Sequence, residues 1–517
     1  MPDLFDKGRY FNRTLFLSVF LIAVSTFNYG FDNQAFSTIQ AMEHFTKRFG
    51  EYDTVKSKYV LPPSWLSLFN SLNYIGFAAG VIIGSLISSR FGRRWCMFVM
   101  SIYALGTATI AVTSNSKDQI MAARILNYVY VGMELSVVPI FQSEIVPAPV
   151  RGFVVGTYQL SLVVGGLTIN SICYGTSKID DNRSWRIPLG LFYIVPSIVA
   201  ALIFLVPESP RWLLRQNRPE EAKAMLVKLR QGAFTTDEVE AEFLELRLAL
   251  ESEEKGKFVE VFRGKNVLRT AIVIGVNFFQ QATGQAFASQ YGAVYVRTLG
   301  IFNPVLFSLI NSAINVIINS GTLLVTDKLG RRTLLMISSV AMMGCLLSMG
   351  SLGIQVPVST ARMKGIMALI SLFGASFSLG WAPLTYVVAT EVSALRLRDH
   401  TSRVGFTVNV VFNFLVNFSI PYLVWPENAG LGSKVGFIFG SVAFCSLIFT
   451  YFCVPECKGK TLEQVDYLFK TGVGLRHFVD ADAGGLLKSN QGLQRKEEHQ
   501  SDVEKGSSFV AYQKDSK

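Results

Sequence analysis

Twelve apolar blocks of about 20 residues, separated by short polar turns, constrain this chain more than any other feature. A helix of that length crosses the hydrocarbon core of a bilayer, because each residue adds roughly 1.5 Å along the axis. Backbone groups inside lipid find no water, so a spanning segment must satisfy its own hydrogen bonds. The period-2 alternation typical of a membrane β-barrel is missing from the sequence. The blocks therefore predict an all-α membrane protein with twelve transmembrane helices.

The composition agrees with a membrane class, since 50% of the residues are hydrophobic and only 16% are charged, whereas soluble proteins carry about 25% charge. We expect the spans at 14–34, 67–88, 95–114, 119–141, 153–174, 187–206, 269–290, 302–325, 333–355, 363–390, 403–424 and 434–454.

The longest polar segment divides the spans into two sets of six. We expect an N-terminal half at 1–206 and a C-terminal half at 269–470. Between them, 207–268 holds amphipathic and charged stretches such as EEAKAMLVKLR, which predict a cytoplasmic linker with short helices. The tail at 471–517 is polar and rich in Gly, Ser, Lys and Glu, so we expect it to be disordered in the cytoplasm.

The formal net charge of +11 indicates topology rather than nucleic-acid binding, because no basic patch lies on a soluble face. If both termini are cytoplasmic, about 35 of the 48 Lys and Arg residues lie on that side of the membrane. We expect a multi-pass protein of the plasma membrane with both termini in the cytoplasm. The six cysteines show no metal or redox spacing, and no nucleophile or cofactor motif is present. The sequence thus predicts no enzyme, no catalytic residue, no metal site and no cofactor.

The two halves repeat their polar motifs in the same order. SRFGRRW follows the second span and DKLGRRT the eighth, while SEIVPAPVRG follows the fourth and TEVSALRLRD the tenth. PESPRW and PECKGKTLEQ end the sixth and twelfth spans. Such matched pairs indicate parallel repeats around a central cavity. The candidate residues in these motifs are Arg93, Arg94, Glu144, Arg151, Glu208 and Arg211 in the first half, and Asp327, Arg331, Arg332, Glu391 and Arg396 in the second.

We interpret these motifs as a cytoplasmic latch. Gly lets the chain turn tightly, and Arg in a short loop can pair with a Glu at the end of a neighbouring helix, where the charge also suits the helix dipole. Such pairs would hold the cytoplasmic side closed or open during transport. The alternative is a plain positive-inside anchor, which needs Lys or Arg but no matched Glu and no Gly.

The motifs resemble those of the sugar porter family of the major facilitator superfamily, and its fungal members in particular. The resemblance runs from about Thr14 to Gln464 and rests on GRR after spans two and eight, SEIVPAPVRG, PESPRWL, QQATGQ, GWAP and PECKGKTLEQ. PESPRWL and PECKGKTLEQ are specific to sugar porters, since other facilitators share the GRR turn but rarely these two. The resemblance implies the major facilitator fold and sugar transport by alternating access.

Asp32, near the outer end of the first span, and Arg124, in the fourth, call for explanation, because the bilayer penalises charge there. They are candidate partners. The resemblance implies that Asp32 is the proton site of a symporter, titrating against Arg124. A desolvated carboxylate beside an Arg would respond to conformation, which suits that role. The alternative is a fixed structural ion pair, since some facilitative sugar porters also carry Asp there.

A sugar requires many neutral groups that donate and accept hydrogen bonds, and aromatic rings that cover its apolar faces. Among the amides in the spans, Gln159, Gln280, Gln281, Asn315 and Asn409 match sugar contacts of the family. Gln285 lies four residues after Gln281, so we expect the two on one helix face. Tyr386 stands where the family has a Trp on the sugar. The alternative role for these amides is hydrogen bonding between helices.

Several departures from the hexose pattern leave the cargo open. The family's QQ-x-x-G-x-N motif here carries Ala286 in place of the Asn, and the first residue of its Tyr pair is Gln290. Together with Tyr386, these changes reshape the pocket, so a disaccharide, a polyol or a sugar-like acid competes with plain glucose.

We therefore expect transport of a mono- or disaccharide by alternating access, with proton symport as the leading mechanism. Its partners would be a sugar, protons and the lipid bilayer, without nucleic acid, and the sequence leaves the oligomeric state open. One alternative is a facilitative carrier or an exporter of a non-sugar metabolite. Another is a nutrient sensor that signals through its tail, although fungal sensors of this type have much longer tails than the roughly 50 residues here.

Overall fold

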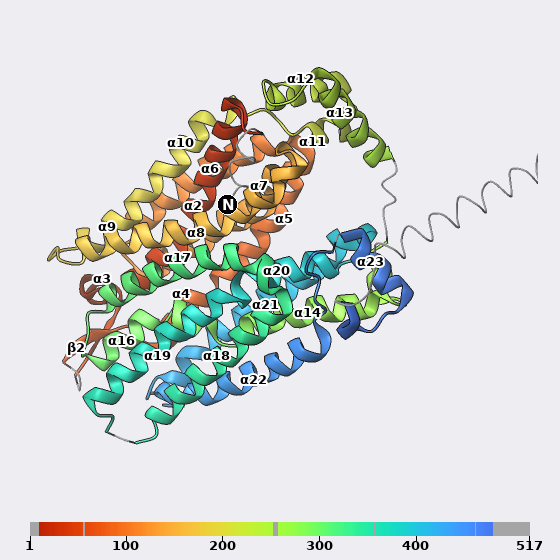
Figure 1. Cartoon of the computed structure of the whole chain (residues 1–517). Coiled ribbons are helices and arrows are strands. Elements are labelled where there is room, and N and C mark those ends of the chain that lie inside the picture. The colour runs from red at the N-terminus through yellow and green to blue at the C-terminus, as the bar shows by residue number, and fades with distance from the viewer. Residues whose placement is uncertain (1–9, 55–56, 252–256, 356, 461, 479–517) are drawn as a thin grey trace, which may run out of the picture.

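The computed structural model describes residues 10–54, 57–251, 257–355, 357–460 and 462–478. Nearly all of the regular structure in this part of the chain is helical, as the sequence predicts (Figure 1). A small antiparallel hairpin is the exception to the all-helical expectation. It joins β1 (Glu51–Asp53) to β2 (Lys58–Val60) in the loop after the first span, with Tyr52 opposite Tyr59.

The first half contains six spans and a short helix, α3 (Glu43–Phe49), that precedes the hairpin. Its spans are formed by α2 (Arg13–Ile39), α4 and α5 (Pro63–Ser71 and Asn73–Phe91), α6 (Arg93–Val112), α7 (Lys117–Ile145), α8 (Ala148–Thr176), and the series α9, η1, α10 and η2 (Arg183–Gly190, Leu191–Tyr193, Ile194–Leu202 and Ile203–Leu205).

The second half repeats this plan, and short helices connect the two. The linker holds α11 (Pro210–Arg215), α12 (Pro219–Arg230), α13 (Thr236–Glu251) and η3 (Phe258–Phe262). The spans of the second half are α14 to α16 (Asn266–Ala282, Gln285–Ser289 and Gly292–Leu299), α17 (Pro304–Leu329), α18 (Arg331–Leu352), α19 and α20 (Thr360–Leu379 and Trp381–Val392), α21 (Arg398–Val424) after η4 (Leu395–Leu397), and α22 (Val435–Cys453) after η5 (Gly432–Lys434).

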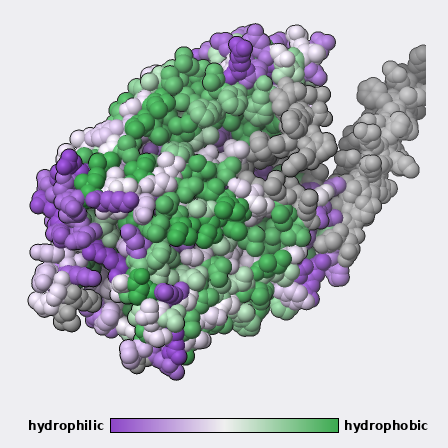
Figure 2. Space-filling view, turned by 60° about the vertical axis from the view of Figure 1, so that its left-hand side comes forward, coloured by the Kyte–Doolittle hydropathy of each residue, from purple (hydrophilic) through white to green (hydrophobic). Residues whose placement is uncertain are grey.

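Ten of the described helices are long and apolar enough to cross a membrane. They correspond to ten of the twelve expected spans. The other two, expected at 153–174 and 269–290, lie in α8 and in the broken series α14 to α16. Large apolar side chains cover the outside of the bundle, including Leu86, Leu205 and Ile317, which are 64%, 78% and 69% exposed. Figure 2 shows the resulting apolar band, with hydrophilic residues gathered towards its ends.

Glycines let the helices of the first half approach until their backbones touch. A Cβ on Gly30 of α2 would lie 1.8 Å from the carbonyl oxygen of Leu162 in α8. Between α5 and α7, a Cβ on Gly80 would lie 2.1 Å from the carbonyl oxygen of Val129. Small residues at such crossings are typical of helix packing in lipid, where van der Waals contact replaces the hydrophobic effect.

The seventh span differs from the single helix expected at 269–290. It breaks after Ala282, and Gly284 adopts a left-handed φ of 82° before α15 begins. The tenth span also divides, at Gly380, into α19 and α20. Gln281 and Gln285 therefore do not share one helix face, and that prediction is wrong, because the break changes the direction of the chain between them.

The two halves lie side by side, with α11 to α13 and α23 (Leu462–Thr471) at one end and α3 and the hairpin at the other (Figure 1). We call these the linker end and the hairpin end. Hydrogen bonds between the described residues join the halves near the hairpin end, among them Ser67 to the Phe418 carbonyl at 2.7 Å, Asn170 to Ser312 at 2.7 Å, Gln290 to Asn33 at 2.9 Å and Arg297 to the Met42 carbonyl at 3.3 Å.

The chain beyond the last span is structured further than expected. We predicted disorder from 471 onwards, but η6 (Leu475–Phe478) follows α23, and the Phe478 ring packs on Phe469 at 5.0 Å between centroids. The cause is an apolar side chain, buried against α23, within a polar stretch. The remainder of the predicted tail, 479–517, lies outside the described residues.

Candidate functional site: two glycine–arginine corners, a buried ion pair and an amide cluster

Each Gly-Arg-Arg motif forms a corner that only Gly can make. Gly92 and Gly330 have φ of 101° and 89° with ψ of 168° and 161°, a backbone region essentially reserved for Gly. A Cβ on Gly92 would lie 2.6 Å from Oε2 of Glu208, and a Cβ on Gly330 would lie 2.4 Å from Oε2 of Glu456. Both backbone conformation and space therefore require Gly at these two positions.

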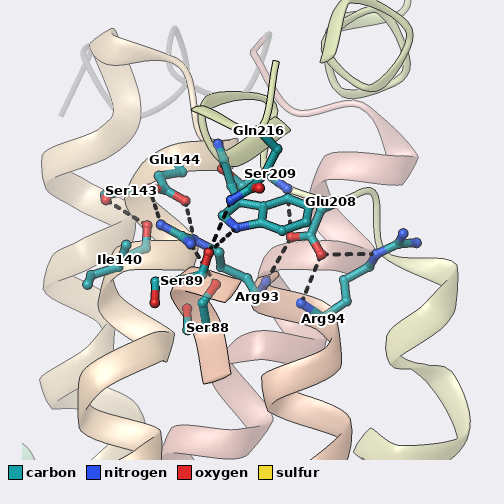
Figure 3. A network of polar contacts seen from close by, with 11 residues as sticks. Ser88, Ser89, Arg93, Arg94, Ile140, Ser143, Glu144, Glu208, Ser209 and Gln216 are labelled. Atoms are coloured by element: carbon teal, nitrogen blue, oxygen red, sulfur yellow. Dashed lines mark hydrogen bonds and ion pairs between the residues drawn. The ribbon is translucent and has the colours of Figure 1, made fainter. Parts of the chain in front are cut away.

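In the first corner, the Glu208 carboxylate completes the start of α6 (Figure 3). It accepts hydrogen bonds from the backbone N–H groups of Arg93 at 3.1 Å and Arg94 at 3.2 Å. These N–H groups have no partner inside the helix, and they form the positive end of its dipole. The Arg94 guanidinium also lies 3.5 Å from the same carboxylate. A buried anion thus holds the sixth span to the start of the third.

The Arg93 side chain connects this corner to the end of α7. Its guanidinium donates two hydrogen bonds to Glu144, at 2.9 and 3.0 Å, and a third to the Ser88 carbonyl at 2.9 Å. Both side chains of the ion pair are only 7% exposed. A bidentate pair of this kind fixes orientation as well as distance, which Lys would not do. The Trp212 indole adds α11 to the cluster by donating to the Ser89 carbonyl at 2.9 Å.

The second half repeats the corner with a residue that the sequence analysis missed. Glu456 accepts from the N–H groups of Arg331 at 3.0 Å and Arg332 at 2.9 Å, as Glu208 does in the first half. The Arg331 guanidinium lies 3.2 Å from Glu391. The signal was present in the sequence, because the PEC of PECKGKTLEQ stands where the first half has the PES of PESPRW.

The remaining latch candidates are placed as follows. Arg396 pairs with Glu260 of η3 in the linker. The hydrogen bond from the Lys257 N–H and the Arg396 charge hold the pKa of Glu260 below its usual value. Arg211 lies in the first turn of α11. The side chains of Arg151 and Asp327 lie outside the described residues.

In each corner the charge pairs join residues of the same half, and Arg396 pairs with Glu260 of the linker. That these pairs hold the cytoplasmic side closed or open during transport stays a prediction, and in this conformation they fasten the helices of each half. The physical reason is that each corner brings together the ends of helices from the same repeat.

Asp32 and Arg124 lie together in the first half, between α2 and α7. The Arg124 Nη1 atom lies 4.0 Å from the Asp32 Oδ1 atom, and the two side chains are 6% and 5% exposed. The guanidinium also stacks on aromatic rings, 3.9 Å from the centroid of Phe36 and 4.9 Å from that of Tyr128. Cation–π contacts of this kind stabilise a desolvated charge. The pair is therefore buried and loosely coupled, without a hydrogen bond between its members.

Three of the predicted sugar ligands form one hydrogen-bonded cluster where α14 meets α21. Asn409 donates to the Gln280 side-chain oxygen at 2.6 Å, and Gln281 donates to the Asn409 side-chain oxygen at 3.1 Å. Gln280 also donates to the backbone carbonyl of Trp381 at 3.2 Å. Each amide keeps further capacity to donate or accept. The cluster is a preformed set of neutral polar groups.

The other predicted ligands lie on separate helices. Gln285 and Asn315 line a small cavity of about 60 Å³, and Asn315 accepts a hydrogen bond from Ser378 at 2.8 Å. Tyr386 on α20 is 38% exposed and stacks with Phe406 of α21 at 5.9 Å between centroids. Gln159 is half-buried on α8 of the opposite half. In the described residues, no group of three or more His, Cys, Asp or Glu side chains could hold a metal ion.

Comparison with known proteins decides the family. Residues 18–469 match the family model described as "Sugar (and other) transporter". The chain belongs to the sugar porter family of the major facilitator superfamily. It is thus a multi-pass membrane transporter and not an enzyme, with twelve helices in two six-helix halves, as the sequence predicts.

Relatives of this sugar porter include a high-affinity glucose transporter of Schizosaccharomyces pombe, 29% identical over 90% of this chain and 88% of that protein. A high glucose sensor of Saccharomyces cerevisiae is 28% identical over 87% of this chain but only 60% of the sensor. Among solved structures, the inward-open form of the xylose transporter XylE from E. coli has a TM-score of 0.70 and 21% identity, covering 88% of this chain and 99% of that one. At this identity the structural match establishes the fold alone.

Proposed function

We propose that this sugar porter carries a mono- or disaccharide across the plasma membrane by alternating access, together with a proton. The amide cluster of Gln280, Gln281 and Asn409 is the observation that carries the sugar assignment. Sugar hydroxyls both donate and accept hydrogen bonds, and amides offer both functions without a charge. The names of the relatives, a glucose transporter and a xylose transporter, support the same class of cargo.

The remaining ligands of this proposal approach the cluster from other helices. Gln159 and Asn315 would bond the sugar from α8 and α17, and the exposed ring of Tyr386 would cover one of its apolar faces. Ala286 and Gln290 stand where hexose carriers have Asn and Tyr, so we leave the identity of the sugar to experiment. The Gln290 side chain donates to Asn33 across the halves, which gives it a role in closing the hairpin end.

Proton coupling rests on the Asp32–Arg124 pair. An ionised Asp32 neutralises Arg124 in a site with little water, whereas a protonated Asp32 leaves that cation without its counter-charge. The proton affinity of Asp32 therefore differs between conformations in which the two residues are in contact and conformations in which they are apart. A proton gradient would then bias the exchange between outward-open and inward-open forms.

We place the linker end in the cytoplasm. Asn12, just before α2, donates to the carbonyls of Leu229 at 3.2 Å and Gln231 at 2.9 Å in the linker, so the start of the chain lies at that end. The basic residues concentrate in the loops of the same end, in accord with the positive-inside rule.

Two alternatives remain. The similarity to a glucose sensor favours a receptor that binds sugar without carrying it. A facilitative carrier, or an exporter of a non-sugar metabolite, would keep the fold and lack the coupling.

Uptake of labelled D-glucose, D-fructose, D-xylose, maltose, sorbitol and a uronic acid into transporter-deficient cells, at acidic and at neutral external pH, tests the proposal. We expect at least one sugar to accumulate, and to accumulate more at acidic pH. Asp32→Asn should abolish the pH effect. Glu43→Gln removes an exposed carboxylate of α3 outside the bundle and should leave uptake unchanged.

An uptake rate that changes neither with external pH nor in Asp32→Asn would refute symport and favour facilitation. If no compound enters the cells while truncation of the tail alters the induction of sugar-responsive genes, the sensor replaces the carrier.

A further inference from the structure

A second carboxyl group lies in the core of the first half, and the proposed transport cycle does not use it. Glu134 of α7 is 0% exposed. The Tyr158 hydroxyl of α8 donates a hydrogen bond to its Oε2 atom at 3.1 Å, while its Oε1 atom has no hydrogen-bond partner. In the described part of the chain no Lys, Arg or His forms an ion pair with it. The sequence analysis missed this residue, although a Glu inside the otherwise apolar run GMELSVVPI is itself a signal of function.

Glu134 and Asp32 have opposite electrostatic settings. Asp32 lies 4.0 Å from a guanidinium, so its negative charge is compensated when it is ionised. Glu134 has the neutral hydroxyls of Tyr158 and Thr26 facing it, and no counter-charge among the described residues. An ionised carboxylate in such a site costs several kcal/mol, and a bound proton removes that cost. In this conformation a single proton shared between the two groups therefore resides on Glu134.

Two polar side chains, Asn28 and Tyr130, lie between the levels of the two carboxyl groups along the bundle. Asn28 lies one turn before Asp32 on α2, towards the linker end, and Tyr130 lies one turn before Glu134 on α7, towards the hairpin end. The Asn28 amide donates to the Tyr130 hydroxyl at 3.2 Å. Since α2 and α7 run in opposite directions, the order from hairpin end to linker end is Asp32, then Asn28 with Tyr130, then Glu134 with Tyr158.

The neighbours of Glu134 contain no further cation. From α2, Thr26 and Tyr29 face it, and α8 contributes Tyr158. On α7 itself, Arg124 lies ten residues away, which is about 15 Å along the helix.

Among the other helices that pack on α7, α6 brings the Arg93 guanidinium to it, which pairs with Glu144, ten residues or about 15 Å along the helix from Glu134. Helix α11, which carries Arg211 and Arg215, also packs on α7.

Further contacts of α5 and α6 with α7 involve neutral groups. Tyr74 of α5 faces α7 at Tyr128, with 5.8 Å between the ring centroids. Tyr103 of α6 donates to the Leu126 carbonyl at 3.0 Å. Cys96 of α6 is buried near α5, where it donates to the Gly84 carbonyl at 3.5 Å. None of the ion pairs of the described residues includes Glu134, so its charge has no counter-ion when it is ionised.

We propose that Glu134 is a second proton-binding residue of the transporter, which receives the proton from Asp32 and releases it at the linker end. This proposal rests on the symport proposed above. In the transfer, the O–H bond of the Asp32 carboxyl breaks, and its carboxylate pairs with Arg124. The Glu134 carboxylate forms the new O–H bond. Opening of the linker end then lets water reach Glu134 past Tyr158, and the proton leaves to that water. One proton moves and nothing is oxidised.

Glu134→Gln tests the transfer, because the amide keeps the size and the hydrogen bond to Tyr158 but cannot carry a proton. The purified full-length protein is reconstituted into liposomes, and the probe is the best-transported sugar of the panel above. We expect the variant to exchange sugar at equal pH on both sides at nearly the wild-type rate. A pH gradient should no longer drive accumulation, so the sugar concentrations inside and outside become equal. Glu134→Asp, which restores a carboxyl group, should recover accumulation in part.

Accumulation by Glu134→Gln at the wild-type level would overturn the proposal, while loss of accumulation in Asp32→Asn would still support symport. If the wild type and both variants all show no accumulation driven by the pH gradient, the symport proposal itself is refuted. Loss of exchange as well as accumulation in Glu134→Gln would assign the residue a structural role and overturn the proposal too.

Infrared spectroscopy of the unmodified protein gives a second test that does not depend on the Gln variant folding. A carboxylic-acid C=O band of a buried group should persist at neutral pH, and Glu134→Asp should shift its frequency. Absence of that band, or a band that Glu134→Asp leaves unchanged, would show that Glu134 does not hold the proton.

Discussion

Replacing Gly92 with Ala offers the sharpest test of the corner geometry. The substitution forces a residue with a Cβ into φ 101°, ψ 168°, which costs about 1–3 kcal/mol. The new Cβ would also lie 2.6 Å from the Glu208 carboxylate. The carboxylate must then move away from the two N–H groups it accepts from, and each charged hydrogen bond contributes about 1.5–3 kcal/mol. We expect a loss of at least about 3 kcal/mol in stability.

Gly106 provides the matched control on the same helix. It lies on an exposed part of α6, and an added Cβ would meet nothing within 4 Å. Ala is favoured over Gly in a helix by about 0.5–1 kcal/mol, so Gly106→Ala should be neutral or stabilising. For a unit of roughly 200 residues each kcal/mol shifts Tm by about 2–4 °C. Gly92→Ala should therefore melt at least about 6 °C below the wild type.

The assay is the apparent Tm of the detergent-solubilised protein, followed by fluorescence-detected size-exclusion chromatography after heating. The second half offers the same comparison with Gly330→Ala, whose Cβ would lie 2.4 Å from Glu456, and Gly344→Ala, which meets nothing within 4 Å. If the corner variants melt with their controls, the reasoning from φ and from carboxylate contact is wrong.

Three further outcomes follow from the described contacts. Glu456→Gln keeps the shape of the side chain but removes the charge of the carboxylate, which accepts hydrogen bonds from two N–H groups of α18. The apparent Tm should therefore fall by several degrees. An unchanged Tm would contradict the capping role of Glu456. Asn170→Ala removes the hydrogen bond to Ser312 between the halves. Closure of the hairpin end should then weaken by about 1 kcal/mol, which should appear as faster hydrogen exchange in α4 and α16. Unchanged exchange in these helices would show that the bond does not hold the hairpin end closed. Burial raises the pKa of the Asp466 carboxyl, but hydrogen bonds from Lys470 and Arg269 outweigh this and set it below its usual value. A depressed pKa stabilises the folded state above the unfolded value of about 4, and this contribution is lost as pH falls through the folded pKa. Protection of the α23 amides from hydrogen exchange, relative to the intrinsic rate at each pH, should therefore be constant from neutral pH down to about 5 and decline only in stronger acid, and in Asp466→Asn it should be low throughout.

Several site residues were within reach of the sequence because they belong to repeated motifs. Arg93, Glu144 and Glu208 come together as their matched spacing indicates, and Glu456 could have been found by extending the same comparison to PEC. The pairing of Arg396 with Glu260 could not be found in this way, since Glu260 belongs to the linker and no repeat relates the two residues.

The candidate amide ligands also include some residues that the sequence places correctly and one that it does not. Gln280, Gln281 and Asn409 meet in the structure, and their residue type together with the resemblance to the sugar porter family marked them as candidates. Gln285 was assigned to the wrong helix face because the break at Gly284 depends on tertiary packing: a Cβ there would lie 2.4 Å from the Phe439 ring of α22. A polar spacing of four residues predicts a shared face only when the helix continues.

The sequence by itself determined the number of spans, the duplication and the family, because the bilayer imposes one length and one polarity on every spanning segment and the motifs are local. Only the tertiary structure decided which charges pair, where helices break and which carboxyl group lacks a counter-ion. Those properties arise from distances between residues far apart in the chain, such as the 4.0 Å between Asp32 and Arg124. A residue such as Glu134 acquires its chemistry from what surrounds it, and hydropathy along the chain does not contain that information.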